Sequence, residues 1–282
     1  MNYFLGIHRE PEYSPGRHTS NDALILRLVG QALERMNVSV RLASLEEARN
    51  FWQEADLIFS MCQGPKAVAE LATWKKQGAR ILNDPFGSQH TYREALCKTL
   101  SQHGIPFPKS TLLSTAASAN LTPHRSFFEK GMAWLKRADV HAMQVEDVVR
   151  VPHWQDLRLA LDRFRARGHA QAILQQHLEG DEVKFYAVRG GQFFWPYYPK
   201  DCIGHPFDEN TLKKVAEDAA RILDLQVYGG DAIISPNGTI TLIDVNDWPS
   251  FAPCRGAAAH AIAYHLKESY AKQGHRETAA KI

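Results

Sequence analysis

The stretch Val227–Phe251, VYGGDAIISPNGTITLIDVNDWPSF, contains the pattern that decides the fold. Two apolar runs, residues 232–234 and 240–243, flank the sequence Ser235-Pro236-Asn237-Gly238. Turn residues between two apolar runs are typical of a β-hairpin. The stretch therefore predicts two antiparallel strands joined by a short turn.

Three oxygen-bearing side chains lie at the end of this hairpin that is opposite the turn. Asp231 opens the first strand, and Asp244 and Asn246 close the second. Asp244 and Asn246 are two residues apart, so they share one face of their strand. Mg²⁺ prefers such hard oxygen ligands. We therefore expect Asp231, Asp244 and Asn246 to bind Mg²⁺; the alternative is that they cap local backbone groups at a turn.

Length and composition are those of a globular protein. The 282 residues, of which 44% are hydrophobic, can form the core of one large domain or of two to three small ones. The formal net charge of +2 and the lack of basic runs interleaved with aromatic residues argue against a nucleic-acid partner. The 13 His residues show no zinc-site spacing.

Features that bear on location point to the cytoplasm. Four Cys residues lie far apart without a Cys-x-x-Cys pair, so we expect free thiols in a reducing compartment: Cys62, Cys97, Cys202 and Cys254. The sequence shows no signal peptide and no apolar run long enough to span a membrane. We expect a cytoplasmic protein without a membrane partner.

The first third of the chain alternates short apolar strands with amphipathic segments. One such helix is expected from about Asp22 to Met36, after the loop His8–Ser20. Alternation of this kind predicts a small parallel sheet covered by helices on both faces, with ligands beyond the carboxyl ends of the strands. This places the turn Cys62-Gln63-Gly64 and the loop with Arg9, Arg17 and His18 near a site, unless Arg17 and His18 are solvated loop residues.

Three segments that precede the hairpin in the sequence belong to the same pattern as the hairpin. The run Ile81–Leu113, ILNDPFGSQHTYREALCKTLSQHGIPFPKSTLL, has an Asn-containing turn, a helix bearing Arg93, and Gly-Ile-Pro-Phe-Pro before a strand. Ala133–Arg137, AWLKR, is a strand that carries a Lys among apolar residues. Ala172–Leu178, AILQQHL, is followed by Glu-Gly-Asp-Glu-Val-Lys. With the hairpin, these segments resemble the ATP-grasp family over roughly residues 82–266.

The resemblance implies two α+β layers that hold ATP with Mg²⁺. Arg93, in the place of the family's usual Lys, would contact the ATP phosphates together with Lys136 and Lys184. Glu182 would bind the ribose, with Asp181 as the alternative. The segment expected to bind adenine through its backbone is Gln175, Gln176, His177 and Leu178. The loop after the Lys136 strand lacks the family's glycines, and His141 could contact the phosphates in their place.

Catalysis and acceptor binding are predicted for residues around the same cleft. The candidates for catalysis are Lys136, Lys184 and Arg255. Loops beyond the strands supply the candidates for a small-molecule acceptor: Arg17, His18, Lys200, His205 and Arg255. Lys200 and His205 follow an aromatic strand on a loop that could overhang a substrate, and Arg255 lies close behind Asn246, although each could be an ordinary surface residue.

The predicted fold class is α/β and α+β: an ATP-grasp fold preceded by a small parallel-sheet domain. We predict an N-terminal domain at residues 1–84, a central lid at 85–170 and a C-terminal subdomain with the Mg²⁺ site at 171–282. Nothing in the sequence predicts an oligomeric state.

Three functions remain open, and one motif decides which of them we place first. Most ATP-grasp proteins phosphorylate a carboxylate and then join it to an amine, and these ligases usually carry Glu-x-Asn at the second metal position. Asp244-Val245-Asn246, followed by a loop with Pro249, is more similar to the inositol-tetrakisphosphate 1-kinase type, as is the Tyr-Gly-Gly-Asp that ends at Asp231. We therefore place a phosphotransferase first and a carboxylate–amine ligase second. A non-catalytic nucleotide-binding regulator is the third reading, because the glycine-rich loop is missing.

Overall fold

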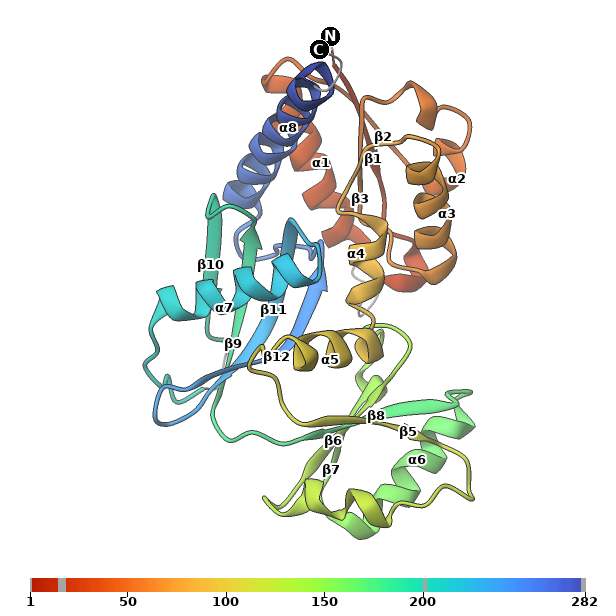
Figure 1. The fold of residues 1–282 in the computed structure, drawn as a ribbon, viewed down its shortest axis with the longest axis vertical. Coiled ribbons are helices and arrows are strands. Elements are labelled where there is room, and N and C mark those ends of the chain that lie inside the picture. Colours follow the sequence, from red (N-terminus) through yellow and green to blue (C-terminus); the bar gives the residue numbers. More distant parts are fainter. Residues whose placement is uncertain (1, 15–18, 200–201, 280–282) are drawn as a thin grey trace.

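The computed structural model describes residues 2–14, 19–199 and 202–279. Three four-stranded sheets are arranged along the long axis of the molecule (Figure 1). The N-terminal sheet lies at one end, the C-terminal sheet in the middle and the lid at the other end.

The N-terminal sheet is parallel throughout, as predicted, and its strand order is β2-β1-β3-β4. Its strands are β1 (Tyr3–Ile7), β2 (Ser39–Ala43), β3 (Leu57–Ser60) and β4 (Ile81–Leu82). The helices between them are α1 (Thr19–Arg35), α2 (Leu45–Ala48) and α3 (Pro65–Lys76). Helix α1 begins three residues before the predicted start.

Both faces of this sheet are buried because its central strands carry apolar side chains on both faces. Phe4 and Phe59 pack with α1 on one face, and Leu5 and Ile58 pack with α3 on the other. The C-terminal helix α8 (Arg255–Ala279) lies beside α1 and packs in the same core as Phe4 (Figure 1). The chain therefore returns to its N-terminal domain after completing the C-terminal sheet.

The lid is an antiparallel sheet with strand order β5-β8-β6-β7. Its elements are β5 (Ser110–Ser114), β6 (Ala133–Arg137), β7 (Val148–Val151), α6 (Leu157–Ala166) and β8 (Gln171–Gln176). The predicted boundary at residue 170 falls just before β8, an inner strand of the lid sheet. Two helices precede the lid: α4 (Pro85–His90) and α5 (Arg93–Gln102).

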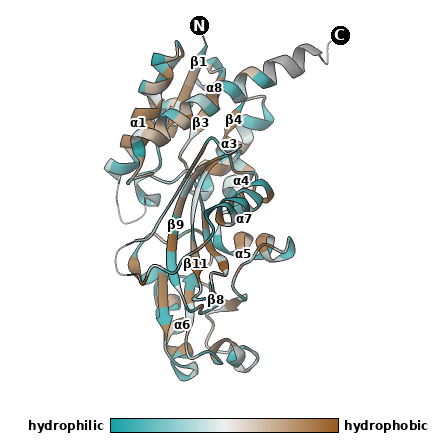
Figure 2. Cartoon of the chain, turned by 90° about the vertical axis from the view of Figure 1, so that its left-hand side faces the viewer, coloured by the Kyte–Doolittle hydropathy of each residue, from teal (hydrophilic) through white to brown (hydrophobic). Residues whose placement is uncertain are grey.

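The C-terminal sheet is also antiparallel, with strand order β10-β9-β11-β12. Its elements are β9 (Asp181–Val188), β10 (Phe193–Tyr197), α7 (Glu209–Ile222), β11 (Val227–Ile234) and β12 (Ile240–Asp247). Helices α5 and α7 share its main apolar core. Figure 2 shows the apolar residues along the strands and the inner helix faces, with polar residues outside.

The predicted hairpin is present, and its strands are longer than expected. Asp231 pairs with Asp244 inside the β11–β12 ladder, followed by a bulge between Asp231 and Ala232. The prediction that these acids lie where the strands end is therefore wrong. The strands continue because Gly229 and Gly230 allow close packing: a Cβ on Gly230 would lie 2.4 Å from the Asp244 carbonyl oxygen.

No helix among the described residues is both long and apolar enough to cross a membrane.

Candidate active site

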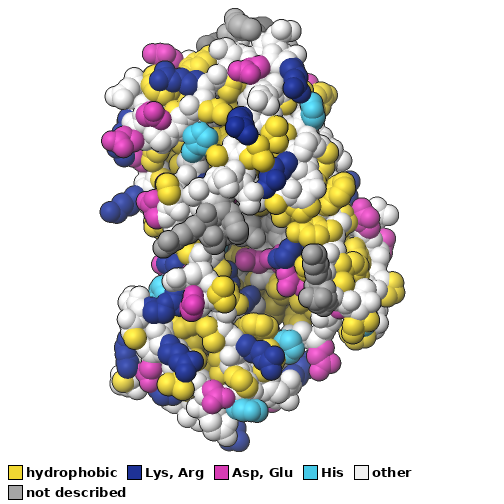
Figure 3. Space-filling model, turned by 180° about the vertical axis from the view of Figure 1, so that it is seen from behind, with side chains coloured by type: hydrophobic (Ala, Val, Ile, Leu, Met, Phe, Trp, Pro, Cys, Tyr) yellow, Lys and Arg dark blue, Asp and Glu magenta, His cyan; other side chains and the backbone are white. Residues whose placement is uncertain are grey.

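Two cavities meet at the paired acids of the hairpin. The first, of about 480 Å³, lies between the lid and the C-terminal sheet; the second, of about 540 Å³, lies between that sheet and the N-terminal domain. Both are lined by Lys184, Asp231, Asp244 and Ala142. Figure 3 shows a hollow between the lid, at the bottom of the view, and the rest of the molecule above it, with acidic and basic side chains inside the hollow. Ligands in the two cavities would therefore approach one another at Asp231 and Asp244.

Asp231 and Asp244 lie opposite each other on the adjacent strands β11 and β12, and each has a cationic neighbour. Asp231 Oδ1 is 2.8 Å from Lys184 Nζ, and Asp244 Oδ2 is 3.3 Å from Arg93 Nη2. Burial raises the pKa of Asp231, and the nearby Asp244 adds to the rise although Lys184 opposes it. Two like charges directly opposite one another destabilise a sheet unless a cation compensates them.

This arrangement fits a hard divalent cation. The two carboxylates supply oxygen ligands from adjacent strands, and Asn246 lies on the same strand face as Asp244 and lines the second cavity. Among the described residues, no three His, Cys, Asp or Glu side chains gather closely enough to hold a metal ion. A cation here would thus depend on two carboxylates, with the amide of Asn246 as the third protein ligand.

Three basic side chains line the first cavity. Arg93 is the first residue of α5; its side chain is 5% exposed, and its Nε has no hydrogen-bond partner among the described residues. Burial lowers the pKa of Lys136 to about 8, and Arg93 contributes to the fall. Although burial acts in the opposite direction, Asp231 and Glu182 raise the pKa of Lys184. The structure therefore gathers the three predicted phosphate-binding residues in one cavity.

The predicted hinge lines the same cavity. It contributes Gln175, Gln176, His177 and Leu178. The Gln175 side chain is buried, and its Nε2 donates to Ser110 Oγ at 3.1 Å. Trp134 Nε1 donates to His177 Nδ1 at 3.2 Å and places an aromatic ring at the cavity wall. Trp134 was missed, although its spacing of two residues from Lys136 could have revealed it.

Of the two acids considered for the ribose, only Glu182 lines the cavity. Its carboxylate lies 2.6 Å from Lys184 Nζ. Asp181 instead accepts hydrogen bonds from the backbone N–H groups of Ile203, Gly204 and His205. Asp181 thus fixes a loop and is not available for a ligand.

The residues predicted for the acceptor have different outcomes. Arg17, His18 and Lys200 lie outside the described residues. His205 is anchored through its backbone to Asp181, at the end of the sheet that carries the hairpin turn, and it lines neither cavity. The expectation that His205 overhangs the acceptor is therefore wrong, because the Asp181 carboxylate draws the loop away.

Arg255 lies at the edge of the second cavity and does not line it. Its Nη2 donates to Asn21 Oδ1 at 2.6 Å, and Asn21 is a lining residue. Arg255 Nε is buried without a partner among the described residues. Arg255 therefore contacts a lining residue of the cavity, Asn21, and does not face the cavity itself.

The second cavity is also lined by residues outside the predicted metal and acceptor sets: Arg9, Asn21, Asp22, Gln63, His141, Asp247 and Ser250. Each nitrogen of the Arg9 guanidinium has a partner: Nη2 donates to Trp248 O at 2.6 Å, Nε donates to Met61 O at 3.2 Å, and Nη1 lies 3.5 Å from Asp22. The sequence offered one signal: Arg9 and Asp22 flank the loop at the carboxyl end of β1, where parallel sheets bind ligands.

His141 connects the lid to the N-terminal domain. Its Nε2 lies 3.3 Å from the Tyr13 carbonyl oxygen, which can only accept, so Nε2 carries the proton. Burial and the neighbouring Arg9 lower the pKa of His141 to about 4, which keeps the ring neutral at pH 7. The glycine-free loop thus contacts the N-terminal domain.

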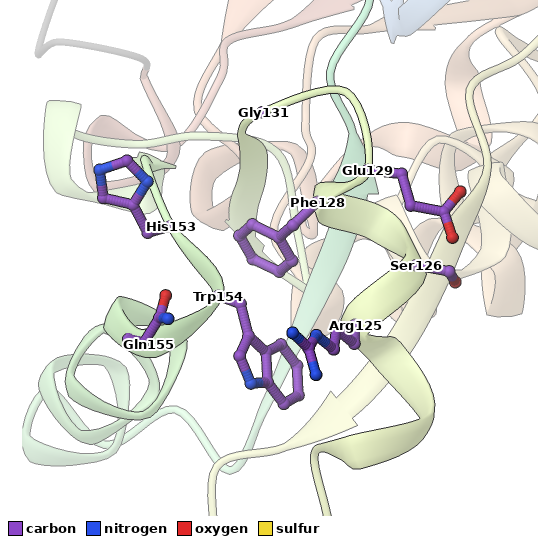
Figure 4. A pocket seen from close by; sticks show the side chains of 8 residues that line it. All are labelled: Arg125, Ser126, Phe128, Glu129, Gly131, His153, Trp154 and Gln155. Carbon is purple, nitrogen blue, oxygen red and sulfur yellow. The ribbon is translucent and has the colours of Figure 1, made fainter.

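A separate cavity of about 430 Å³ lies in the lid, between η4 (Thr122–Phe128) and η6 (Trp154–Asp156) (Figure 4). Phe128, Trp154 and Arg125 form its walls, whereas the Glu129 carboxylate points away. It contains none of the predicted site residues.

Comparisons with known proteins support the fold. No family model matches the sequence, and no curated protein is significantly similar to it. Among solved structures, D-alanine–D-alanine ligase from Bacillus anthracis complexed with ATP superposes with a TM-score of 0.72 at 10% identity, covering 97% of this chain and 100% of the ligase. A RimK domain ATP-grasp protein from Sphaerobacter thermophilus gives a TM-score of 0.70 at 15% identity, covering 93% and 99%.

A third structure, the ATP-grasp ligase PsnB complexed with a minimal precursor, Mg and ADP, gives a TM-score of 0.64 at 14% identity, covering 95% and 98%. All three superpose over nearly their full length, so the likeness includes the N-terminal domain, the lid and the C-terminal sheet. The expected likeness to inositol phosphate kinases in particular is not supported by these comparisons. The chain has the ATP-grasp fold.

Proposed function

We propose that this protein is an ATP-dependent carboxylate–amine ligase. The observation that carries the proposal is the meeting of two cavities at Asp231, Asp244 and Lys184. One cavity has the basic side chains and hinge that suit ATP, and the other can hold an acceptor against the same acids. The ligases among the structural neighbours add support.

The second cavity favours a ligase over a kinase acting on a highly phosphorylated acceptor. Such an acceptor needs several free cations, since each phosphate group carries up to two negative charges. Among the described residues that line the cavity, only Arg9 and Lys184 carry a positive charge at pH 7, since the ring of His141 is neutral. Arg9 is taken up by Asp22 and two carbonyl groups, and Lys184 by Asp231 and Glu182. Amides and carboxylates dominate the remaining wall and suit an acceptor with amine and carboxyl groups.

In the proposed mechanism, positioning and charge do most of the work. Arg93, Lys136 and Lys184 hold the ATP phosphates, with the γ-phosphoryl group pointing toward the second cavity. Mg²⁺ held by Asp231, Asp244 and Asn246 would neutralise negative charge on these phosphates. The acceptor carboxylate takes the γ-phosphoryl group and ADP leaves; an amine then attacks the acyl phosphate, forming an amide and releasing inorganic phosphate.

Binding of ATP is the first requirement. Calorimetric titration with a non-hydrolysable ATP analogue should show one site, and binding should strengthen at least about tenfold when Mg²⁺ is added, because the cation offsets the two acids facing the phosphates. The analogous GTP compound should bind more weakly, since hinge backbone groups suit the edge of adenine. The proposal fails at this step if millimolar analogue gives no heat of binding.

The type of reaction is tested with hydroxylamine. The protein is incubated with Mg²⁺·ATP, a panel of amino acids and short peptides, and hydroxylamine in place of the amine. A ligase should form hydroxamate and ADP in equal amounts, because acyl phosphates react with hydroxylamine and phosphate esters do not. With the natural amine, ADP and inorganic phosphate should rise together. ADP formed with the phosphoryl group retained on a stable product would instead identify a kinase.

A further inference from the structure

A cavity of about 470 Å³, separate from the two active-site cavities, lies where the turn between β9 and β10 approaches α8. Its lining residues are Arg189, Gly190, Gln192, Gln226, His265, Ser269 and Lys272. None of them carries a carboxylate, and none lines either active-site cavity. Two of the lining side chains are cations, and the others that are polar are hydroxyl, amide and imidazole groups.

Among the described residues, the acidic partners of the two cations are loose and lie outside the lining. Arg189 Nη1 is 3.8 Å from Asp224, and Lys272 Nζ is 3.6 Å from Glu268. Charge-assisted hydrogen bonds are about 2.7–2.9 Å long, so neither pair is a direct one. Exposed pairs of this kind contribute little energy. Most N–H donors of Arg189 and Lys272 therefore remain available to a ligand.

The neutral donors are held in place. His265 Nε2 lies 2.8 Å from Gln226 Oε1, which can only accept, so the imidazole donates and the amide nitrogen of Gln226 is left for another acceptor. The Gln226 backbone is fixed on both sides, because its N–H donates to Asn83 Oδ1 and its carbonyl accepts from Arg189 N–H. Ser269 Oγ lies 3.4 Å from His265 Nε2.

We propose that this cavity binds a small anion through a phosphate or carboxylate head group held between Arg189 and Lys272. The Ser269 hydroxyl and the Gln226 amide supply neutral donors to the same group. The positive field of the cavity supports the assignment: burial, together with Arg189 and Lys272, lowers the pKa of His265 to about 4. The site is independent of the proposed ligase reaction.

The test uses the full chain with its nucleotide cavity saturated by a non-hydrolysable ATP analogue. Inorganic phosphate and succinate are titrated separately by calorimetry, alongside nitrogen NMR of the His265 ring. At least one of the two anions should bind at a single site. Binding of phosphate would indicate a phosphate ligand, and binding of succinate would indicate a carboxylate ligand. The double variant Arg189→Gln/Lys272→Gln should bind it at least about tenfold more weakly, since two charge-assisted contacts are lost.

The matched control removes two exposed cations elsewhere, in Arg27→Gln/Lys98→Gln, and should bind as the wild type does. A bound anion should raise the pKa of His265, because it offsets Arg189 and Lys272 while Asp224 and Glu268 stay in place. The proposal is overturned if neither anion binds at about 10 mM. It is also overturned if the control variant weakens binding equally, or if the His265 pKa does not move.

Discussion

Replacing Asp244 by Asn should reduce turnover at least about a hundredfold, corresponding to about 3 kcal/mol of lost transition-state stabilisation. Asp244 lies opposite Asp231 and 3.3 Å from Arg93, at the point where the two cavities meet. Asn keeps the shape and one oxygen of the side chain but loses its charge. Steady-state measurement of ADP release with the acceptor found by the hydroxylamine assay gives the effect.

The variant should fold normally, because Asn can still accept a hydrogen bond from Arg93. The melting temperature should therefore stay within a few degrees of the wild type. Asp218→Asn is the matched control: Asp218 pairs with Arg221 on the exposed side of α7, far from both cavities, and its loss should leave turnover unchanged. Near-normal turnover of Asp244→Asn would mean that Asp244 only caps local backbone and pairs with Arg93.

Replacing Lys136 by Met should weaken binding of the ATP analogue by about ten- to a hundredfold and make the free protein more stable. Lys136 is 7% exposed, and burial and Arg93 lower its pKa from the usual 10.5 to about 8. That fall corresponds to a destabilisation of about 3 kcal/mol at neutral pH. Met has a similar length and no charge, so it removes this cost together with the contact to the phosphates.

The pH dependence identifies the cause. The unfolded chain binds the Lys136 proton more tightly than the folded chain, so the destabilisation is complete below pH 8. It fades between pH 8 and 10.5 and is absent above that range. The difference in melting temperature between Lys136→Met and the wild type should therefore be largest at pH 7 and shrink toward pH 10.5. A difference independent of pH, or equal to that of the exposed Lys98→Met, would contradict this explanation.

Much of the site could be predicted because its residues lie on strands with fixed alternation. Lys136, Glu182, Lys184, Asp231 and Asp244 all line the first cavity. In a strand, side chains two residues apart share a face. Once one residue of a strand is placed in the cavity, the alternation tells which other residues of that strand face it. The resemblance to a known fold supplied the order of these strands, and the comparisons agree with it.

Residues on loops were harder to predict, because their positions depend on contacts that a sequence pattern does not specify. His205 was expected over the acceptor, but the Asp181 carboxylate binds three successive backbone N–H groups of its loop and holds it at the other end of the sheet. His141 was considered for the phosphates, but its ring contacts Tyr13. Each outcome depends on a hydrogen bond between segments that are far apart in the sequence.

By itself, the sequence determined the parallel sheet in the first third of the chain, the existence of a hairpin within Val227–Phe251, and the basic and acidic side chains that the strands present. These follow from local periodicity and turn residues. Only the tertiary structure decided the second cavity, where Arg9 pairs with Asp22 and bonds to Trp248 O. It also decided that α8 packs on the N-terminal sheet. The physical reason is that burial, desolvation and hydrogen bonding between distant segments select one arrangement among many that share the same local pattern.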